Sequence, residues 1–355
     1  MEFTYAVEGL ASAPTRWTER DENIHSKFDE KLCSEWDAAM EAGIFRYKLD
    51  DLQTKIISDK YKFVLQLNTK RATERRKPEQ ISSIDQPFNH ERFNFTKVKK
   101  HEILFEMKPV SNHVGNRLDV QQNNITAEKE HNPHLVIINI SPLEYCNVLL
   151  VPHINSCFPQ ILNQISIKLA LEMMLLSSKK SLRLAWNSLC AFASVNHLHF
   201  HAYYLERNLY TEITECQQVE GTLFETTDWP VRSFVLQLNG SDLQSLTKDI
   251  YKVTSYLHAN NTAHNVFLTR GDCLERRPDG RTIRVYIYPR QSFYGAKTFM
   301  AFNPAVCELS GHILVKCEED YNKLTEETVI EILKQVALPD KQFEDIKTHI
   351  QDLFK

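Results

Sequence analysis

The sequence predicts an α+β protein built from two diverged halves. Short runs rich in apolar and β-branched residues, typical of strands, are separated by longer segments whose apolar residues recur with the period of a helix. The order of predicted elements in residues 45–228 is similar to their order in residues 229–355, which indicates a diverged internal duplication. Residues 1–44 are expected to form a loosely attached arm, up to residue 23, and one helix.

The first predicted helix covers residues 26–42 and is followed by Gly43, a suitable helix stop. Its apolar residues recur at every fourth position, at Phe28, Leu32, Trp36 and Met40. Strands are expected over residues 45–49 and 62–67. The basic run over residues 70–77, closed by Pro78, is most simply a solvated loop, and the alternative is a cradle for a polyphosphate.

The rest of the chain alternates strands with helices. Further strands are expected over residues 101–107, 135–140, 147–151, 182–186, 194–205, 232–238, 264–269 and 282–288. A polar connector is expected over residues 108–133. Helices are expected over residues 160–177, with Ile161, Ile165, Leu169 and Met173 on one face, over 241–258, and in a C-terminal region from about residue 324.

Composition limits the class of protein. Of the 355 residues, 42% are hydrophobic and 25% are charged, which is ordinary for a soluble globular protein. The net charge of -4 argues against nonspecific nucleic-acid binding. No apolar run approaches the ~20 residues of a membrane span, and residues 1–5 do not resemble a signal peptide. The eight cysteines include no Cys-x-x-Cys pair and are expected to be reduced thiols in a cytoplasmic protein.

Three histidines alternate with apolar residues at His197, His199 and His201. On a strand they would share one face, lining a cleft, while Leu198 and Phe200 would face the core. One interpretation is a set of ordinary polar residues on a half-exposed strand. A second is a metal site, but the three residues span about 13 Å of strand, whereas a metal–nitrogen bond is about 2.1 Å. One ion could therefore bind two of them at most.

The third interpretation is nucleophilic catalysis at phosphorus, and the pattern favours it. A neutral imidazole nitrogen can attack phosphorus when its other ring nitrogen is held by a hydrogen-bond partner. The flanking His197 and His201 and the hydroxyl of Ser194, three residues before His197, can then hold the phosphate oxygens as parts of the catalytic site. No ligand motif such as His-Glu-x-x-His accompanies the run, so neither a metal nor another cofactor is expected.

These residues match a known family. Residues 194–201, Ser-Val-Asn-His-Leu-His-Phe-His, are similar to the signature of the histidine-triad superfamily, whose fold has antiparallel sheets with packed helices. Residues 66–71, the Arg75-Arg76 pair and residues 303–312 resemble one branch, the GDP-hexose phosphorylases, which are related to galactose-1-phosphate uridylyltransferase. The resemblance covers roughly residues 45–340, with residues 45–228 as the catalytic half and 229–355 as a degenerate half.

The resemblance implies a role for each matching residue. His199 would be the nucleophile that forms a covalent nucleotidyl-histidine, and His197 would orient it. Ser194 and Asn187 would hold the phosphate region. Asn139 would contact the ribose and Glu308 the hexose. The basic residues Arg71, Arg75 and Arg76 could offset the charge of the pyrophosphate.

The implied reaction is phosphorolysis of GDP-glucose to GDP and glucose 1-phosphate. At position 201 the plant phosphorylases have glutamine and the animal enzymes have histidine, so His201 favours GDP-D-glucose over GDP-L-galactose. Another sugar, hydrolysis, and a non-catalytic guanine-nucleotide-binding module remain alternatives. The expected partners are the sugar nucleotide and inorganic phosphate, with no nucleic acid or membrane, and a homodimer is possible.

Overall fold

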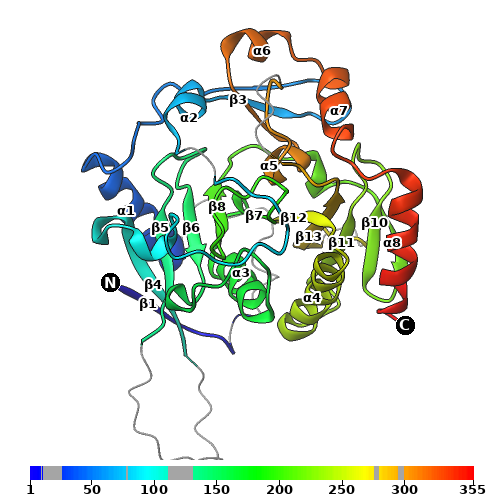
Figure 1. Ribbon diagram of the computed structural model, residues 1–355, viewed down its shortest axis with the longest axis horizontal. Coiled ribbons are helices and arrows are strands. Elements are labelled where there is room, and N and C mark those ends of the chain that lie inside the picture. Colours follow the sequence, from blue (N-terminus) through cyan, green and yellow to red (C-terminus); the bar gives the residue numbers. More distant parts are fainter. Residues whose placement is uncertain (9, 11–25, 77–78, 111–130, 276–279, 295–299) are drawn as a thin grey trace, which may run out of the picture.

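The computed structural model describes residues 1–8, 10, 26–76, 79–110, 131–275, 280–294 and 300–355. Within these ranges, one large sheet has the order β1-β4-β5-β6-β8-β7-β12-β13-β11-β10-β9 (Figure 1). Its strands are β1 (Glu2–Ala6), β4 (Ile103–Val110), β5 (His134–Ile138), β6 (Val148–Val151), β7 (Leu182–Asn187), β8 (Phe200–Tyr204), β9 (Cys216–Glu220), β10 (Leu223–Thr226), β11 (Phe234–Gln237), β12 (Ala263–Asp272) and β13 (Arg281–Arg290). Neighbouring strands are antiparallel, except that β1 runs parallel to β4.

The large sheet contains the same arrangement twice. Read inward from β4, the first half runs β4-β5-β6-β8-β7; read inward from β9, the second runs β9-β10-β11-β13-β12. In each half a long helix comes before the last two strands of that half along the chain: α3 (Gln164–Leu176) follows β6, and α4 (Leu243–Ala259) follows β11. The central pairing of β7 with β12 joins the halves. The predicted α+β fold with two diverged halves is therefore confirmed.

The second half has lost the histidine pattern. Its strand β13 corresponds to β8 in the shared order, and its sequence, RTIRVYIYPR, contains no histidine. The sequence predicted that the second half begins at residue 229. The repeated strand order favours an earlier start, at β9 (Cys216–Glu220). The division of the chain into domains itself stays a prediction.

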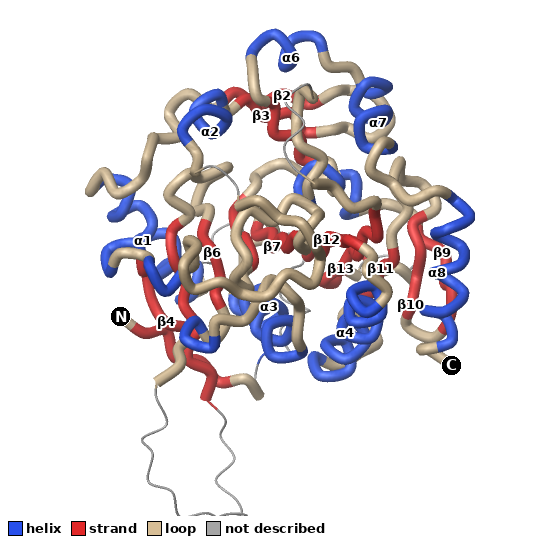
Figure 2. The backbone as a smooth tube through the Cα atoms, viewed as in Figure 1, coloured by secondary structure: helices blue, strands red, loops and turns tan. Residues whose placement is uncertain are grey.

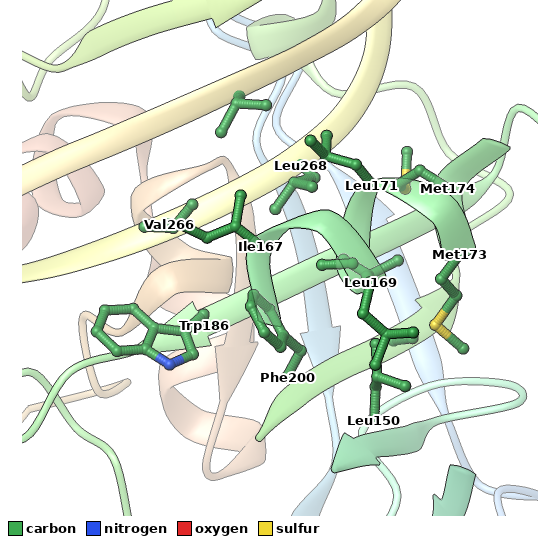
Figure 3. Close-up of a cluster of buried hydrophobic side chains, with 14 of the residues drawn as sticks. Leu150, Ile167, Leu169, Leu171, Met173, Met174, Trp186, Phe200, Val266 and Leu268 are labelled. Carbon is green, nitrogen blue, oxygen red and sulfur yellow. The ribbon is translucent and has the colours of Figure 1, made fainter. Parts of the chain in front are cut away.

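Helices α3 and α4 cover one face of the sheet together with α1 (Lys27–Glu41) and α8 (Asp340–Asp352). Figure 3 shows side chains of α3, including Leu169 and Met173, directed towards Phe200 and Leu150 of the sheet. Phe200, Ala202 and Tyr204 of β8 all belong to this core. The odd-numbered residues of β8 therefore face the other side of the sheet.

The opposite face is covered by a small sheet with the order β14-β3-β2 and by short helices (Figure 2). These elements are β2 (Gln53–Ile56), β3 (Val64–Leu67), β14 (His312–Val315), α2 (Thr69–Glu74), α5 (Val306–Leu309), α6 (Glu318–Lys323) and α7 (Glu326–Lys334). Apolar residues of both sheets, including Tyr203 of β8 and Leu65 of β3, form a second core. Single 3₁₀ turns complete the described elements: η3 (Phe95–Lys97), η4 (Lys100–Glu102), η5 (Ile154–Ser156) and η6 (Tyr210–Glu212).

Most predicted helices and strands are confirmed, but three predictions near the N-terminus are wrong: one strand, the loose arm and the loop at the basic run. Residues 45–49 form no strand, and β2 lies at Gln53–Ile56 instead. The expected arm contributes β1, because Glu2–Ala6 pairs with β4; residues 11–25 lie outside the described part. Most of the basic run is helical as α2, because the side chain of Asn68 caps it by accepting a hydrogen bond from the Arg71 N–H.

Two predictions around the histidine run also need correction. The apolar helix begins at Gln164, after the capping residue Asn163, and Ile165 on its expected buried face is 52% exposed. The strand expected over residues 194–205 is reduced to β8, and the chain bends at residues 195–197. In the described part of the chain, no helix is long and apolar enough to cross a membrane.

Candidate active site

Two adjoining cavities lie beside the histidine run, with volumes of about 510 Å³ and 100 Å³. Both are lined by Arg71, Arg75, Ser194 and His201, so these residues mark the junction. In Figure 1, α2 lies above β5 and β6, and it supplies the arginine side of the junction.

The imidazole of His199 is held in one tautomer. Its Nδ1 lies 2.7 Å from the backbone carbonyl oxygen of His197. A carbonyl can only accept, so Nδ1 carries the proton and Nε2 keeps its lone pair. The ring lines the smaller cavity, and no described residue binds Nε2. The geometry therefore presents an unprotonated nitrogen to a ligand.

Burial keeps this imidazole neutral. His199 is 3% exposed, and burial lowers its pKa to about 4. At pH 7 nearly every molecule therefore carries the nucleophilic form of the ring.

Gln160, which the sequence analysis did not select, fixes the backbone of His199. Its Oε1 accepts a hydrogen bond of 2.9 Å from the His199 N–H, and its Nε2 donates to the His199 carbonyl at 3.1 Å. The same Nε2 donates to the carbonyl of Asn187 at 3.0 Å. One buried amide thus ties the histidine segment to the end of β7. No sequence motif indicates this contact, because Gln160 lies 39 residues before His199.

His197 lies deeper than the alternating pattern predicted. It is fully buried and lines neither cavity, because the chain bends at residues 195–197 instead of continuing as a strand. Its Nδ1 accepts a hydrogen bond of 3.1 Å from the N–H of Phe95 in η3. Its backbone carbonyl, not its ring, makes the bond to His199. Burial lowers the pKa of His197 to about 4.

His201 is the histidine at the junction of the cavities. It lies on β8 opposite Ala185 of β7, and its ring centroid is 5.3 Å from that of His199. Burial, with smaller effects from His199 and the charge of Arg71, holds its pKa well below the ordinary value. Its Nδ1 has no hydrogen-bond partner among the described residues. His201 is therefore neutral.

Ser194 and Asn187 both line the larger cavity. Ser194 is exposed there, and its carbonyl accepts a hydrogen bond of 3.1 Å from the Glu79 N–H. The Oδ1 of Asn187 accepts from Asn265 Nδ2 at 2.6 Å and from the Val306 N–H at 3.1 Å. These two donors fix the orientation of the amide, which leaves the Asn187 NH₂ group to donate to a ligand.

Asn139 and Arg71 are joined through the turn between β5 and β6. Asn139 Oδ1 accepts from the Ser141 N–H at 3.2 Å, and its Nδ2 donates to Asn147 at 3.0 Å. The guanidinium of Arg71 donates to the carbonyl of Ser141. Asn139 lines the smaller cavity, although both ends of its amide already bind the protein.

Glu308 is a buried acid in the wall of the larger cavity. It lies on α5, where its Oε2 accepts a hydrogen bond of 3.1 Å from the Ala305 N–H. Burial raises its pKa to about 7, so near neutral pH the carboxyl group is about half protonated. No group of His, Cys, Asp and Glu side chains able to hold a metal occurs within the described ranges.

The fold is similar to that of a solved Ap4A phosphorylase. The crystal structure of the yeast Ap4A phosphorylase Apa2 in complex with Ap4A matches with a TM-score of 0.59 at 14% identity, covering 89% of this chain and 99% of that one. Family models for the GDPGP1-like N-terminal and C-terminal domains match residues 27–203 and 204–355. The chain belongs to the GDPGP1-like family.

Relatives from animals and plants cover nearly the whole chain. GDP-D-glucose phosphorylase 1 of Danio rerio is 40% identical over 92% of this chain and 91% of its own length. GDP-L-galactose phosphorylase 2 of Arabidopsis thaliana is 31% identical over 94% of this chain and 78% of its own length.

Proposed function

We propose that the chain is an enzyme that converts GDP-D-glucose and inorganic phosphate into GDP and glucose 1-phosphate. The observation that carries this proposal is the tautomer of His199, whose Nδ1–H is bound by the His197 carbonyl while Nε2 is open to the cavity. A protein that only binds nucleotides has no need for such a nucleophile. Membership of the GDPGP1-like family supports the choice of substrates.

In the first step, His199 Nε2 attacks the α-phosphorus of GDP-glucose. The bond between this phosphorus and the bridging oxygen breaks, and glucose 1-phosphate leaves with the electron pair. A sugar phosphate is a weakly basic leaving group, so no strong general acid is required. The bond from His199 Nδ1–H to the His197 carbonyl stabilises the positive charge that develops on the ring.

In the second step, an oxygen of inorganic phosphate attacks the same phosphorus. The Nε2–P bond breaks, GDP leaves, and the electron pair returns to His199. Two displacements at one phosphorus predict net retention of configuration and ping-pong kinetics.

The two cavities suit the two parts of the substrate. Phe95, Ile137 and Leu149 form an apolar part of the wall of the smaller cavity and can contact the purine, with Asn139 near the ribose. Asn187 and Glu308 are polar groups in the wall of the larger cavity and can bind the hydroxyl groups of a hexose. The pyrophosphate would cross the junction, where the Ser194 hydroxyl, His201 and Arg71 can bind its oxygens.

The glucose specificity is supported by His201 and by the higher identity to the animal relative than to the plant relative. The direct test is turnover with a panel of GDP- and UDP-hexoses, each with and without phosphate. We expect GDP-glucose to give the highest kcat/KM, with glucose 1-phosphate formed only when phosphate is present. Equal turnover without phosphate would indicate a hydrolase, and no turnover would indicate a binding module.

A homodimer and a cytoplasmic location, both expected from the sequence, stay predictions. Size-exclusion chromatography with light scattering tests the first, and fluorescence microscopy of the tagged full chain tests the second.

A further inference from the structure

The guanidinium groups of Arg71, Arg75 and Arg76, in and just after α2, differ in the contacts that they make with the protein. Arg71 donates to the carbonyl of Ser141. The guanidinium of Arg76 lies over the ring of Phe93, 3.1 Å from its centroid. Arg75 forms no hydrogen bond or ion pair with any described residue, although it is half-buried and lines both cavities. Its donors are therefore available to a ligand at the junction.

The surroundings of Arg75 favour the binding of an anion. Burial, and then the nearby positive charge of Arg71, lower the pKa of Arg75, so the protein destabilises this charge overall. The acid that faces it is Glu308, whose pKa is raised to about 7 by burial and whose carboxyl group is therefore about half neutral. A phosphate group would supply the missing countercharge and accept two parallel hydrogen bonds from the guanidinium.

The element that carries Arg75 is anchored on its other side. Asn68 caps α2 at the Arg71 N–H with a bond of 2.9 Å and donates to the Pro142 carbonyl at 3.2 Å. Arg71 binds the adjacent Ser141. These contacts fix α2 to the turn between β5 and β6, so that Arg75, at the end of α2, lies over the junction.

We propose that Arg75 holds the acceptor phosphate and thereby directs the guanylyl intermediate to phosphate instead of water. This inference rests on the proposed phosphorylase function. Because the leaving sugar phosphate and the incoming phosphate use the same position at phosphorus, Arg75 contacts both. Inorganic phosphate depends on it more, since it has neither a guanosine nor a hexose to hold it in place.

The test replaces Arg75 with Gln in the full chain. We expect the KM for phosphate to rise about 10- to 100-fold, the effect of losing a charge-assisted hydrogen-bonded pair. The KM for GDP-glucose should rise much less, the stoichiometric first release of glucose 1-phosphate should persist, and a larger share of turnover should end in hydrolysis. Arg75→Lys should recover part of the phosphate affinity.

Lys70→Gln is the matched control. Lys70 lies on the same helix, pairs with Asp51 at 2.7 Å and lines neither cavity, so both KM values should stay at the wild-type level. Thermal melting checks that all variants are folded. An unchanged phosphate KM in Arg75→Gln, or equal increases in both KM values, would overturn the assignment of Arg75. Absence of phosphate-dependent turnover in the wild type would overturn the proposed function itself.

Discussion

At the scale of single residues, the reactivity that we propose for His199 depends on contacts made by its neighbours rather than on an acidic partner. The His197 carbonyl selects the tautomer, and the Gln160 side chain holds the His199 backbone from both sides. Neither cavity is lined by Gln160, so it acts as a positioning residue.

Replacing Gln160 with Ala should lower kcat by about 10- to 100-fold, because a nucleophile displaced by about 1 Å loses that much rate. The KM for both substrates should change little, since the cavity walls remain. Steady-state kinetics with the folded variant measures kcat and both KM values separately. Gln164→Ala, an exposed glutamine at the start of α3, is the control, and a rise in KM without loss of kcat would contradict the positioning role.

The site residues that sequence analysis could identify are those in short local motifs. The spacing from Ser194 to His201 is readable because one segment carries it. The role of Gln160 as a partner of the His199 backbone was not predictable, and neither was the lack of a described hydrogen-bond partner for Arg75. Both features depend on how segments that are distant in sequence pack together. The burial of His197 was missed for a local reason, because strand alternation does not hold across the bend at residues 195–197.

At the scale of elements, α2 is the part of the site that depends most on one cap. It has six residues, none of them buried, and a helix this short is not stable through helix propensity alone. The sequence suggested a loop because the run is basic and lacks an apolar face. The helix forms because Asn68 caps it and ties it to Pro142.

Asn68→Ala should lower the free energy of unfolding by about 1 kcal/mol, the usual effect of losing an N-cap. It should also raise the KM for phosphate, because Arg71 and Arg75 lose their fixed position. Chemical denaturation and phosphate titration measure the two effects. Thr73→Ala, at an exposed position on the same helix, is the control; an unchanged phosphate KM in Asn68→Ala would show that α2 does not organise the junction.

At the scale of the whole molecule, the duplication was readable from the order of elements, whereas the single continuous sheet was not. The two halves are joined by β7 and β12, whose pairing connects residues nearly eighty positions apart, such as Asn187 and Asn265. No periodicity within either strand encodes that contact. The small sheet combines β3 with the distant strand β14 and was missed for the same reason.

Buried neutral histidines give the fold a specific pH dependence. Burial lowers the pKa of His197, His199 and His264 from 6.5 to about 4, and that of His312 to about 3. Between pH 6.5 and 4 the unfolded chain binds protons that the native state does not. The free energy of unfolding should therefore be highest above pH 6.5 and fall as the pH decreases towards 4. Urea denaturation at pH 7 and pH 5 checks this; equal stability at both values would contradict burial of neutral rings.

In the proposed mechanism, His199 carries the guanylyl group between the two substrates. The most direct test of this mechanism is tandem mass spectrometry of the protein after incubation with GDP-glucose in the absence of phosphate, with peptides handled above neutral pH to preserve the acid-labile phosphoramidate. We expect one guanylyl group on His199, its release as GDP when phosphate is added, and no adduct in His199→Ala. A guanylyl group on another residue, or an unmodified His199 in an enzyme that turns over, would contradict it.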